Sequence, residues 1–252
     1  MESIKRVEIN GLRYYEVSSP DGEVIGTYPS ITTVLGETSD KGGLAKWKKR
    51  VGEEEAKRIS ELSMNRGTIM HRLIELYKAT SGTKKERLDK LKKIAKTDKE
   101  TQQFSGKENG EIWLAGGWDM FMKFYFNSSQ YFDRIKEVIS AEVFLWSKQG
   151  YAGTVDNISK IVDDRTLVID YKNSRRPKRE EWVQDYFVQG SAYFIAHWER
   201  TGNKPDGVEI WISNEEDPCP QTFSLTAEDI KYYFVEFQRR LALFNEKYPI
   251  LK

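Results

Sequence analysis

Cysteine and long apolar runs are scarce in this sequence of 252 residues. Its single cysteine, Cys219, excludes an intrachain disulfide, a four-cysteine zinc site and a cysteine-ligated iron–sulfur cluster. No apolar run approaches the roughly 18–20 residues of a membrane helix. The N-terminal stretch MESIKRVEINGLRYY lacks the apolar core of a secretory signal. We therefore expect an intracellular protein with no membrane partner.

An excess of charge of one sign is also lacking. The chain has 40 Lys and Arg against 39 Asp and Glu, so the formal net charge is +1. This balance argues against a purely electrostatic binder of nucleic acid but leaves room for a local basic groove. No G-x-x-x-x-G-K-[ST] loop is present, so we expect no ATP hydrolysis by this chain. No G-x-S-x-G elbow is present either, which disfavours a serine hydrolase.

Apolar periodicity predicts an α/β (α+β) fold, with a central mixed β-sheet flanked by helices. Residues 1–137 are expected to form an N-terminal hairpin and helical lobe, with a charged insertion at about 80–110, and residues 138–252 the core. For the insertion, a solvated excursion is favoured over a short helix. The elements expected in the lobe are a β-hairpin or meander over 6–28, a helix opening at Ser30, helices over 44–77 with breaks near Gly52 and Gly67, and a largely buried helix over 112–131.

The core is expected to begin with three strands, the last two joined by a tight turn at Asp163-Asp164 into an antiparallel hairpin. Helices and strands then alternate to the end of the chain. The expected core elements are strands over 138–146, 151–162 and 165–173, a helix over 180–201, a strand over 207–213, a segment over 221–225, and a helix capped by Thr226 that runs to about Lys247.

The hairpin GTVDNISKIVDDRTLVIDYKNS carries an acid on each strand and a lysine on the second. Because side chains alternate along a strand, Asp170 and Lys172 project to one face, and Tyr171 projects to the other with the apolar residues. A twisted hairpin can bring Asp156 beside Asp170, although the sequence leaves the register open. Two carboxylates held close favour a bound cation, and oxygen ligands suit Mg²⁺ or Mn²⁺. Asp-x-Lys alone would more simply be a surface ion pair.

Four motifs in order resemble the PD-(D/E)xK nuclease superfamily, and most of all its RecB-like exonuclease branch. The first two are Gly153-Thr-Val-Asp156 and Val168-Ile-Asp170-Tyr-Lys172. The others are Arg66-Gly-Thr-Ile-Met-His71 on a helix and Gln189-x-x-x-Tyr193 after the lysine strand. The stretch Pro29–Leu35, with Leu44-x-x-Trp47 and Val51-Gly52, is similar to the mitochondrial genome-maintenance exonuclease and related phage exonucleases. The resemblance covers about 28–75 and 138–195.

The resemblance implies a restriction-endonuclease-like core that binds one or two Mg²⁺ or Mn²⁺ ions. Asp156, Asp170, His71 and the carbonyl of Tyr171 would be metal ligands, and Lys172 would be the catalytic lysine beside the two aspartates. Several relatives hold an iron–sulfur cluster, which this chain cannot bind in that way. Residues that would surround the site or contact DNA are Glu142, Gln189, Tyr193, Glu75, Arg66, Ser174, Arg175, Trp47 and Lys48.

Each of these residues also has a simpler interpretation. His71 can pair with Glu75 one turn later on the same helix face. Gln189 and Tyr193 share a helix face that can pack on the sheet with locally satisfied polar ends. The basic residues after the lysine strand can be a solvated loop. Trp47, among lysines, suits the stacking of single-stranded bases but can equally anchor the helical lobe, which we favour slightly.

The expected activity is a metal-dependent DNA exonuclease that hydrolyses phosphodiester bonds, acting on single-stranded ends in recombination, repair or replication. A helicase or a single-strand-binding protein is an expected partner, and the cytoplasm of a phage host or bacterium the expected location, with an organellar matrix left open. The alternatives are a non-catalytic nucleic-acid-binding accessory factor on the same fold, and an endonuclease or flap nuclease. Nothing in the sequence indicates polarity, preferred metal or oligomeric state.

Overall fold

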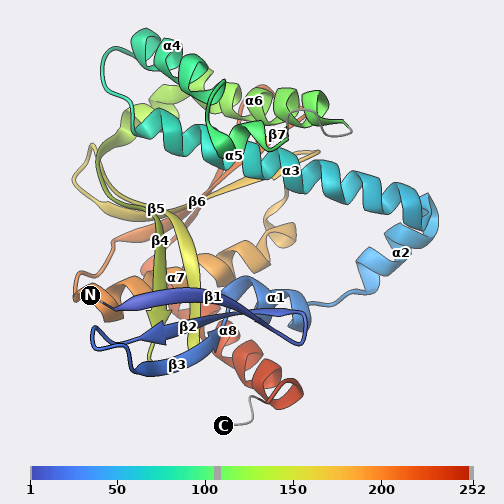
Figure 1. The fold of residues 1–252 in the computed structure, drawn as a ribbon, viewed down its shortest axis with the longest axis vertical. Helices are drawn as coiled ribbons and strands as arrows, with labels where there is room; N and C mark the ends of the chain where they lie inside the picture. The colour runs from blue at the N-terminus through green and yellow to red at the C-terminus, as the bar shows by residue number, and fades with distance from the viewer. Residues whose placement is uncertain (1, 105–108, 250–252) are drawn as a thin grey trace.

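The computed structural model describes residues 2–104 and 109–249 and has a five-stranded mixed sheet at its centre (Figure 1). The strand order is β4-β5-β6-β7-β8, and only the β6–β7 pair is parallel. Mixed α/β architecture was the predicted class, and it is confirmed. The strands are β4 (Ile135–Ser147), β5 (Tyr151–Ile161), β6 (Thr166–Ser174), β7 (Gly207–Asn214) and β8 (Gln221–Leu225).

Helices cover both faces of this sheet. One face packs on α7 (Gln184–Thr201), α8 (Ala227–Lys247) and α1 (Ile31–Thr38). The other face packs on α3 (Glu53–Lys78) and α6 (Gly110–Phe126). Since β7 lies between the two layers, all eight of its residues are buried, as is typical of a strand paired in parallel inside a covered sheet.

A three-stranded antiparallel meander precedes the core, as the turn signals predicted. It comprises β1 (Ser3–Ile9), β2 (Leu12–Ser18) and β3 (Val24–Pro29). The meander packs on the central sheet through Tyr28, whose ring stacks on Trp146 with centroids 5.5 Å apart. Ser30 then caps α1, because its hydroxyl accepts the backbone N–H of Thr33 at 3.0 Å.

The expected helix break near Gly52 is confirmed, and the one near Gly67 is wrong. Gly52 has φ +88° and separates α2 (Gly42–Val51) from α3. Gly67 lies inside α3, which runs unbroken from Glu53 to Lys78. A Cβ at this position would lie 3.0 Å from Oδ1 of Asn173, a residue of β6. Gly67 therefore brings the helix close to the strand and does not end the helix.

The charged residues after α3 are not the solvated excursion that the composition favoured. They form α4 (Lys84–Ala95) and the short α5 (Lys99–Gln102), which lie beside α3 and α6 in Figure 1. Leu88, Leu91 and Ala95 of α4 are buried at the helical spacing of three and four. Charged residues occupy the other positions of α4 except Ile94, so the helix is amphipathic. Positions 105–108 of the expected insertion lie outside the described residues.

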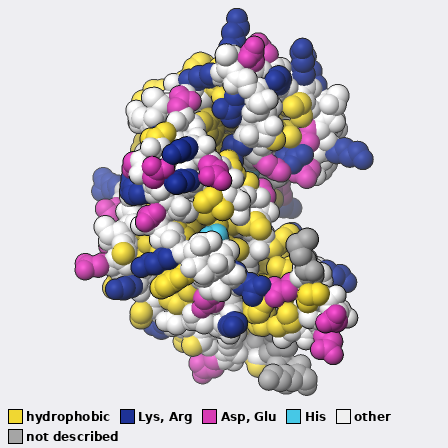
Figure 2. Space-filling model, turned by 90° about the vertical axis from the view of Figure 1, so that its left-hand side faces the viewer, with side chains coloured by type: hydrophobic (Ala, Val, Ile, Leu, Met, Phe, Trp, Pro, Cys, Tyr) yellow, Lys and Arg dark blue, Asp and Glu magenta, His cyan; other side chains and the backbone are white. Residues whose placement is uncertain are grey.

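The helix expected over 112–131 is shorter than predicted. It ends at Phe126 and gives way to two 3₁₀ turns, Ser128–Gln130 and Phe132–Arg134, before β4. Another such turn, Glu180–Trp182, precedes α7. On the face turned to the viewer in Figure 2, basic and acidic side chains are interspersed, as the balanced composition predicted. None of the helices in the described ranges combines the length and apolar character needed to cross a bilayer.

Candidate active site

Asp170 and Lys172 lie on the same face of β6, as strand alternation predicted. The Nζ of Lys172 is 2.5 Å from Oδ2 of Asp170, which is fully buried. The other oxygen of Asp170 accepts a hydrogen bond from Nε2 of Gln189 at 3.2 Å, and Gln189 also donates to the hydroxyl of Tyr193 at 3.3 Å. Burial raises the pKa of Asp170, and Lys172 counteracts part of this rise. Gln189 of α7 thus holds Asp170 in place by a hydrogen bond, and its bond to Tyr193 fixes Gln189 in turn.

The motif glycine of GTVD makes room for that support. A Cβ on Gly153 would lie 2.9 Å from Cε1 of Tyr193 and 3.2 Å from Cδ1 of Ile31. Real Cβ atoms do not approach other heavy atoms below 3.0 Å, so a larger residue here would displace the tyrosine. Gly153 therefore lets α7 and α1 come close to β5 beneath the acids.

Asp156 lies where the β5–β6 ladder ends. The register pairs Asn157 with Ile169, which places Asp156 opposite Asp170 one step further along. The backbone N–H of Tyr171 donates to Oδ2 of Asp156 at 2.8 Å. The carboxylate of Asp156 thus takes the place of a backbone carbonyl as the acceptor for this N–H, at the point where the two strands separate. Its other oxygen, Oδ1, is not used by this hydrogen bond.

His71 and Glu142 join Asp156 in a cluster of three. One ligand atom from each of these residues lies within 4.8 Å of the other two. His71 comes from α3, and its Nδ1 is 3.6 Å from Oδ1 of Asp156. Glu142 comes from β4, where Ala141 pairs with Asn157 and Val143 with Val155, so Glu142 is opposite Asp156. The cluster therefore combines α3 with the two consecutive strands β4 and β5.

Glu142 has a strained backbone. Its φ of +49° is rare for a residue with a Cβ, and it lies in a strand whose register shifts twice between Ile135 and Ser140. Removal of water from its carboxyl, together with the neighbouring acids Asp156 and Glu75, raises the pKa of Glu142 to about 8. Backbone strain and crowded acids in one place are typical of a functional site.

The donor set fits a divalent cation. One imidazole and two carboxylates can converge on a single ion, and the repulsion between Glu142 and Asp156 would be relieved by it. Asp170 is not among these three residues, and its two oxygens contact Lys172 and Gln189. The sequence indicated His71, Asp156, Asp170 and the carbonyl of Tyr171 as ligands, with Glu142 near the site. The structure brings Glu142 together with His71 and Asp156.

A groove of about 910 Å³ opens above the cluster. Its walls come from α2, α3, α5, the middle of β4, the end of β6 and the loop after β6. His71 and Glu142 lie in one part of the groove, and Trp47 and Met64 form an apolar part. The lining residues are Leu44, Trp47, Ile59, Ser60, Ser63, Met64, Gly67, Thr68, His71, Arg72, Glu75, Glu100, Glu142, Asn173 and Lys178.

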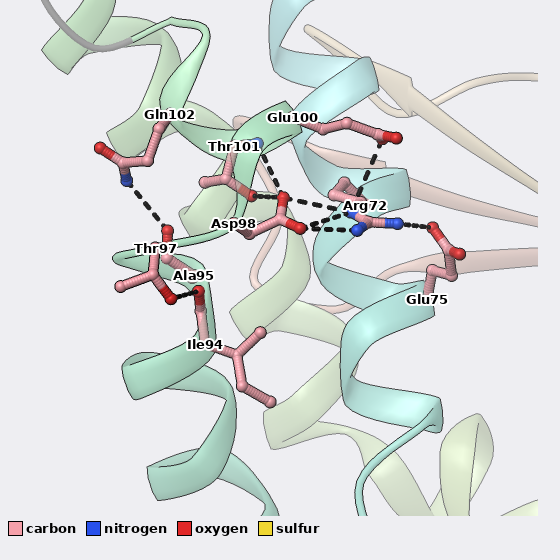
Figure 3. A network of polar contacts seen from close by, with 9 residues as sticks. All are labelled: Arg72, Glu75, Ile94, Ala95, Thr97, Asp98, Glu100, Thr101 and Gln102. Atoms are coloured by element: carbon pink, nitrogen blue, oxygen red, sulfur yellow. Dashed lines mark hydrogen bonds and ion pairs between the residues drawn. The ribbon is translucent and has the colours of Figure 1, made fainter.

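Glu75 is bound to Arg72, not to His71. Nη1 of Arg72 is 2.6 Å from Oε2 of Glu75, and Nη2 is 2.6 Å from Oδ1 of Asp98 (Figure 3). Asp98 also accepts the backbone N–H and the hydroxyl of Thr101, each at 2.9 Å, so the same carboxylate caps α5. The Arg72 side chain therefore fixes α5 beside the groove-lining part of α3, one turn from the cluster.

Other residues predicted to surround the site lie apart from the cluster. Arg66 is buried and pairs with Glu215 in the loop after β7. Ser174 is also buried, and its hydroxyl donates to the carbonyl of Arg176 at 2.7 Å. Arg175 and Lys48 are exposed. These positions are close to the groove walls without lining the groove itself.

Sequence reasoning missed Lys78. This lysine ends α3, and its Nζ donates to Oδ1 of Asn157 at 2.6 Å, directly beside Asp156. Burial lowers the pKa of Lys78 to about 8, although Glu142 and Asp156 counteract the shift. The spacing of His71, Glu75 and Lys78 places all three on one face of a helix, and this was a signal available in the sequence.

A sequence profile of the PD-(D/E)XK nuclease superfamily matches residues 44–249. A crystal structure of a candidate exonuclease from Eubacterium rectale matches with a TM-score of 0.41 and 12% identity, over 67% of this chain and 71% of that chain. A second solved structure, whose name gives no activity or organism, matches with a TM-score of 0.33 and 10% identity, over 70% and 84%. A search of curated proteins finds no match.

Because the profile covers most of the chain and includes all the residues of the cluster, the chain belongs to the PD-(D/E)XK nuclease superfamily. Membership defines the class of protein: a nuclease fold whose substrate is a nucleic acid. The three residues predicted to form the motif of this superfamily, Asp156, Asp170 and Lys172, lie within the matched range.

Proposed function

We propose that the chain is a Mg²⁺- or Mn²⁺-dependent deoxyribonuclease of the RecB-like branch that degrades single-stranded DNA from its ends. The main support is the convergence of His71, Glu142 and Asp156 within 4.8 Å, beside the Lys172–Asp170 pair and at a groove of about 910 Å³. An ordinary surface ion pair would not need a buried aspartate, a strained glutamate and a histidine from a distant helix.

His71, Glu142 and Asp156 would hold the cation, with Asp170 and the carbonyl of Tyr171 as further ligands. When bound, the metal would stabilise negative charge on the phosphate and lower the pKa of a water molecule. Lys172 is held by Asp170 at 2.5 Å and carries its proton, because the pull of Asp170 and Asp156 outweighs burial and raises its pKa. As a cation it would donate a hydrogen bond to the attacking water or to a phosphate oxygen. Gln189 keeps Asp170 in place for this role.

The apolar part of the groove supports an unpaired strand as the substrate. Trp47 is half-buried, while Leu44 and Met64 are 49% and 64% exposed, and all three line the groove. Base rings can stack on such a surface only when they are not paired within a duplex. Lys48, Lys49 and Arg50 follow Trp47 in the last turn of α2 and can attract the polyanion electrostatically without lining the groove.

The preference for strand ends is supported by the position of α2 and α3 over the groove. In Figure 1 these helices extend from the sheet and return to it through α1, so that the chain bridges the two sides of this region. An arch of this kind favours threading of a free end. The alternatives remain an endonuclease or flap nuclease, for which the groove need not be threaded, and a non-catalytic binding factor, which would not need Lys172 and Asp170 to be paired.

A time course of DNA degradation tests the proposal. Single-stranded DNA, linear with a 5′ or 3′ label or closed into a circle, is incubated with Mg²⁺, Mn²⁺ or EDTA. The wild type is compared with Lys172→Ala and with Lys231→Ala, a matched control on the exposed face of α8. We expect metal-dependent loss of linear DNA only, with the rate reduced by about a thousandfold or more in Lys172→Ala and unchanged in the control.

Each other outcome points to a different activity. Cutting of the circle would replace the exonuclease with an endonuclease. Degradation of an RNA strand at the same rate would remove the restriction to DNA. Binding without cutting under every metal condition would contradict the enzyme and favour the binding factor.

A further inference from the structure

The loop that joins β6 to α7 carries a lysine with no assigned partner. Lys178 is half-buried and lines the groove together with His71 and Glu142. Across residues 2–104 and 109–249, its ammonium group forms no hydrogen bond or ion pair. Two other cations of the same loop are engaged, since Arg176 is 3.0 Å from Glu216 and Arg179 is 3.8 Å from Glu181, and Arg175 does not line the groove. Lys178 is therefore a groove cation that is available to a ligand.

The backbone of Lys178 is held on both sides by one amide side chain. Its N–H donates to Oε1 of Gln221 at 2.6 Å, and its carbonyl accepts from Nε2 of the same residue at 2.9 Å. Only one orientation of the amide satisfies both bonds, since one end must accept and the other must donate. Gln221 is the first residue of β8 and pairs with Ile212 of β7. The loop is thus attached to the sheet at the position of Lys178.

A second contact restrains the start of the loop, where the hydroxyl of Ser174 donates to the carbonyl of Arg176 at 2.7 Å. These hydrogen bonds restrict the conformational freedom of the loop. The side chain that they orient is that of Lys178, which lines the groove. Arg72, the other groove-lining cation with a guanidinium or ammonium group in the described ranges, is already neutralised by Glu75 and Asp98. A polyanion in the groove would therefore meet Lys178 as its free positive contact.

We propose that Lys178 binds a backbone phosphate of the single strand in the groove and that Gln221 is the positioning residue that orients it. The proposal rests on the function proposed above and adds a direction to it. The bases of the strand face the apolar wall around Trp47, and its phosphates face the loop after β6. Neither Lys178 nor Gln221 touches the acid cluster through any contact in the described residues.

The test measures binding without cutting. A fluorescein-labelled oligothymidylate is titrated with the protein in EDTA, by fluorescence anisotropy, at a series of KCl concentrations. The variants are Lys178→Met, Lys178→Arg, Gln221→Met and the double variant Lys178→Met/Gln221→Met. Lys204→Met is the matched control, because Lys204 precedes β7 and so lies at the opposite end of the parallel β6–β7 pair.

We expect Lys178→Met to reduce the slope of log K against log salt by about 0.7, the value of one phosphate contact on a single strand. Lys178→Arg should keep the slope and Lys204→Met should leave it unchanged. Gln221→Met should weaken binding in the same direction, and the double variant should be no weaker than Lys178→Met. This non-additivity separates positioning of Lys178 from a general loss of stability.

An unchanged slope in Lys178→Met would overturn the phosphate contact, and additive losses in the double variant would overturn the role of Gln221. If Gln221→Met does not fold, Lys178→Met still decides the first point, since its side chain is not part of the core. Failure of the proposed function is seen separately: it is the absence of cutting by the wild type in Mg²⁺ or Mn²⁺, whatever the salt slopes.

Discussion

Helices α7 and α2 both contact the proposed site, but they are built in opposite ways. In α7, ten of the eighteen residues are buried, and Gln189 on its buried face supports Asp170. In α2, none of the ten residues is buried, and its main neighbour is α3. The difference indicates a division of labour. The packed helix holds the chemistry rigidly, and the exposed helix offers a surface to the substrate.

The largest expected effects come from two tryptophans, Trp211 in the packed sheet and Trp47 on the exposed helix α2. Trp211 of β7 is fully buried, and its Nε1 donates to Glu209 at 2.7 Å. We expect Trp211→Ala to lower the free energy of unfolding by about 3–5 kcal/mol. Trp47→Ala should change it by less than about 1 kcal/mol, yet weaken binding of a single strand by about 1–3 kcal/mol. Urea unfolding and anisotropy measure the two effects.

The comparison would fail if Trp47→Ala destabilised the fold as much as Trp211→Ala, because Trp47 would then be an anchor of the helical lobe. Trp47→Phe is the control for stacking. It keeps an aromatic face and should retain most of the affinity for the strand.

Two helical glycines are expected to respond with opposite signs. A Cβ on Gly190 of α7 would lie 2.6 Å from Cγ1 of Val208, so Gly190→Ala should destabilise the protein by about 1–3 kcal/mol. A Cβ on Gly43 of α2 would meet nothing within 4 Å. Gly43→Ala should therefore stabilise the protein by up to about 1 kcal/mol, through the better helix propensity of alanine. Thermal unfolding of the two variants and the wild type measures the sign of each change in stability. A loss of stability in Gly43→Ala would show that α2 packs closely against its neighbours at this position.

The smallest expected effect concerns Glu142 of β4, whose backbone is strained. Glycine tolerates its φ of +49° without a steric penalty. We expect Glu142→Gly to be more stable than Glu142→Gln by about 1 kcal/mol in EDTA, because only the first variant relieves the strain. Both variants should lose much of the stabilisation that Mn²⁺ gives the wild type, as measured by thermal unfolding. Equal stability of the two variants would mean that the backbone at Glu142 stores no strain.

Much of the core could be predicted because its signals are local. Strand alternation placed Asp170 and Lys172 on one face and Tyr171 on the other. The tight turn at Asp163-Asp164 predicted the β5–β6 hairpin, and Thr226 was identified as a helix cap. In the structure Thr226 and Asp229 form a full capping box, with both reciprocal bonds present.

The errors occurred where distant packing overrides a local signal. Gly67 looks like a helix break in the sequence, but in the structure it accommodates Asn173, whose Nδ2 donates to the carbonyl of Ser63 at 2.9 Å. The charged stretch after α3 looks solvated, because its few apolar residues are diluted by lysines. These residues find a partner surface on α3 and α6 only after the chain has folded.

The sequence by itself determined which chemistry this protein can carry: an acid–lysine pair on one strand, a second acid on the strand before it, a histidine on a distant helix and no cysteine cluster. Only the tertiary structure decided which of these groups meet. His71, Glu142 and Asp156 come from a helix and two strands, and their convergence depends on the docking of α3 and the bulged register of β4. Such distances depend on long-range packing, which no local pattern of residues specifies.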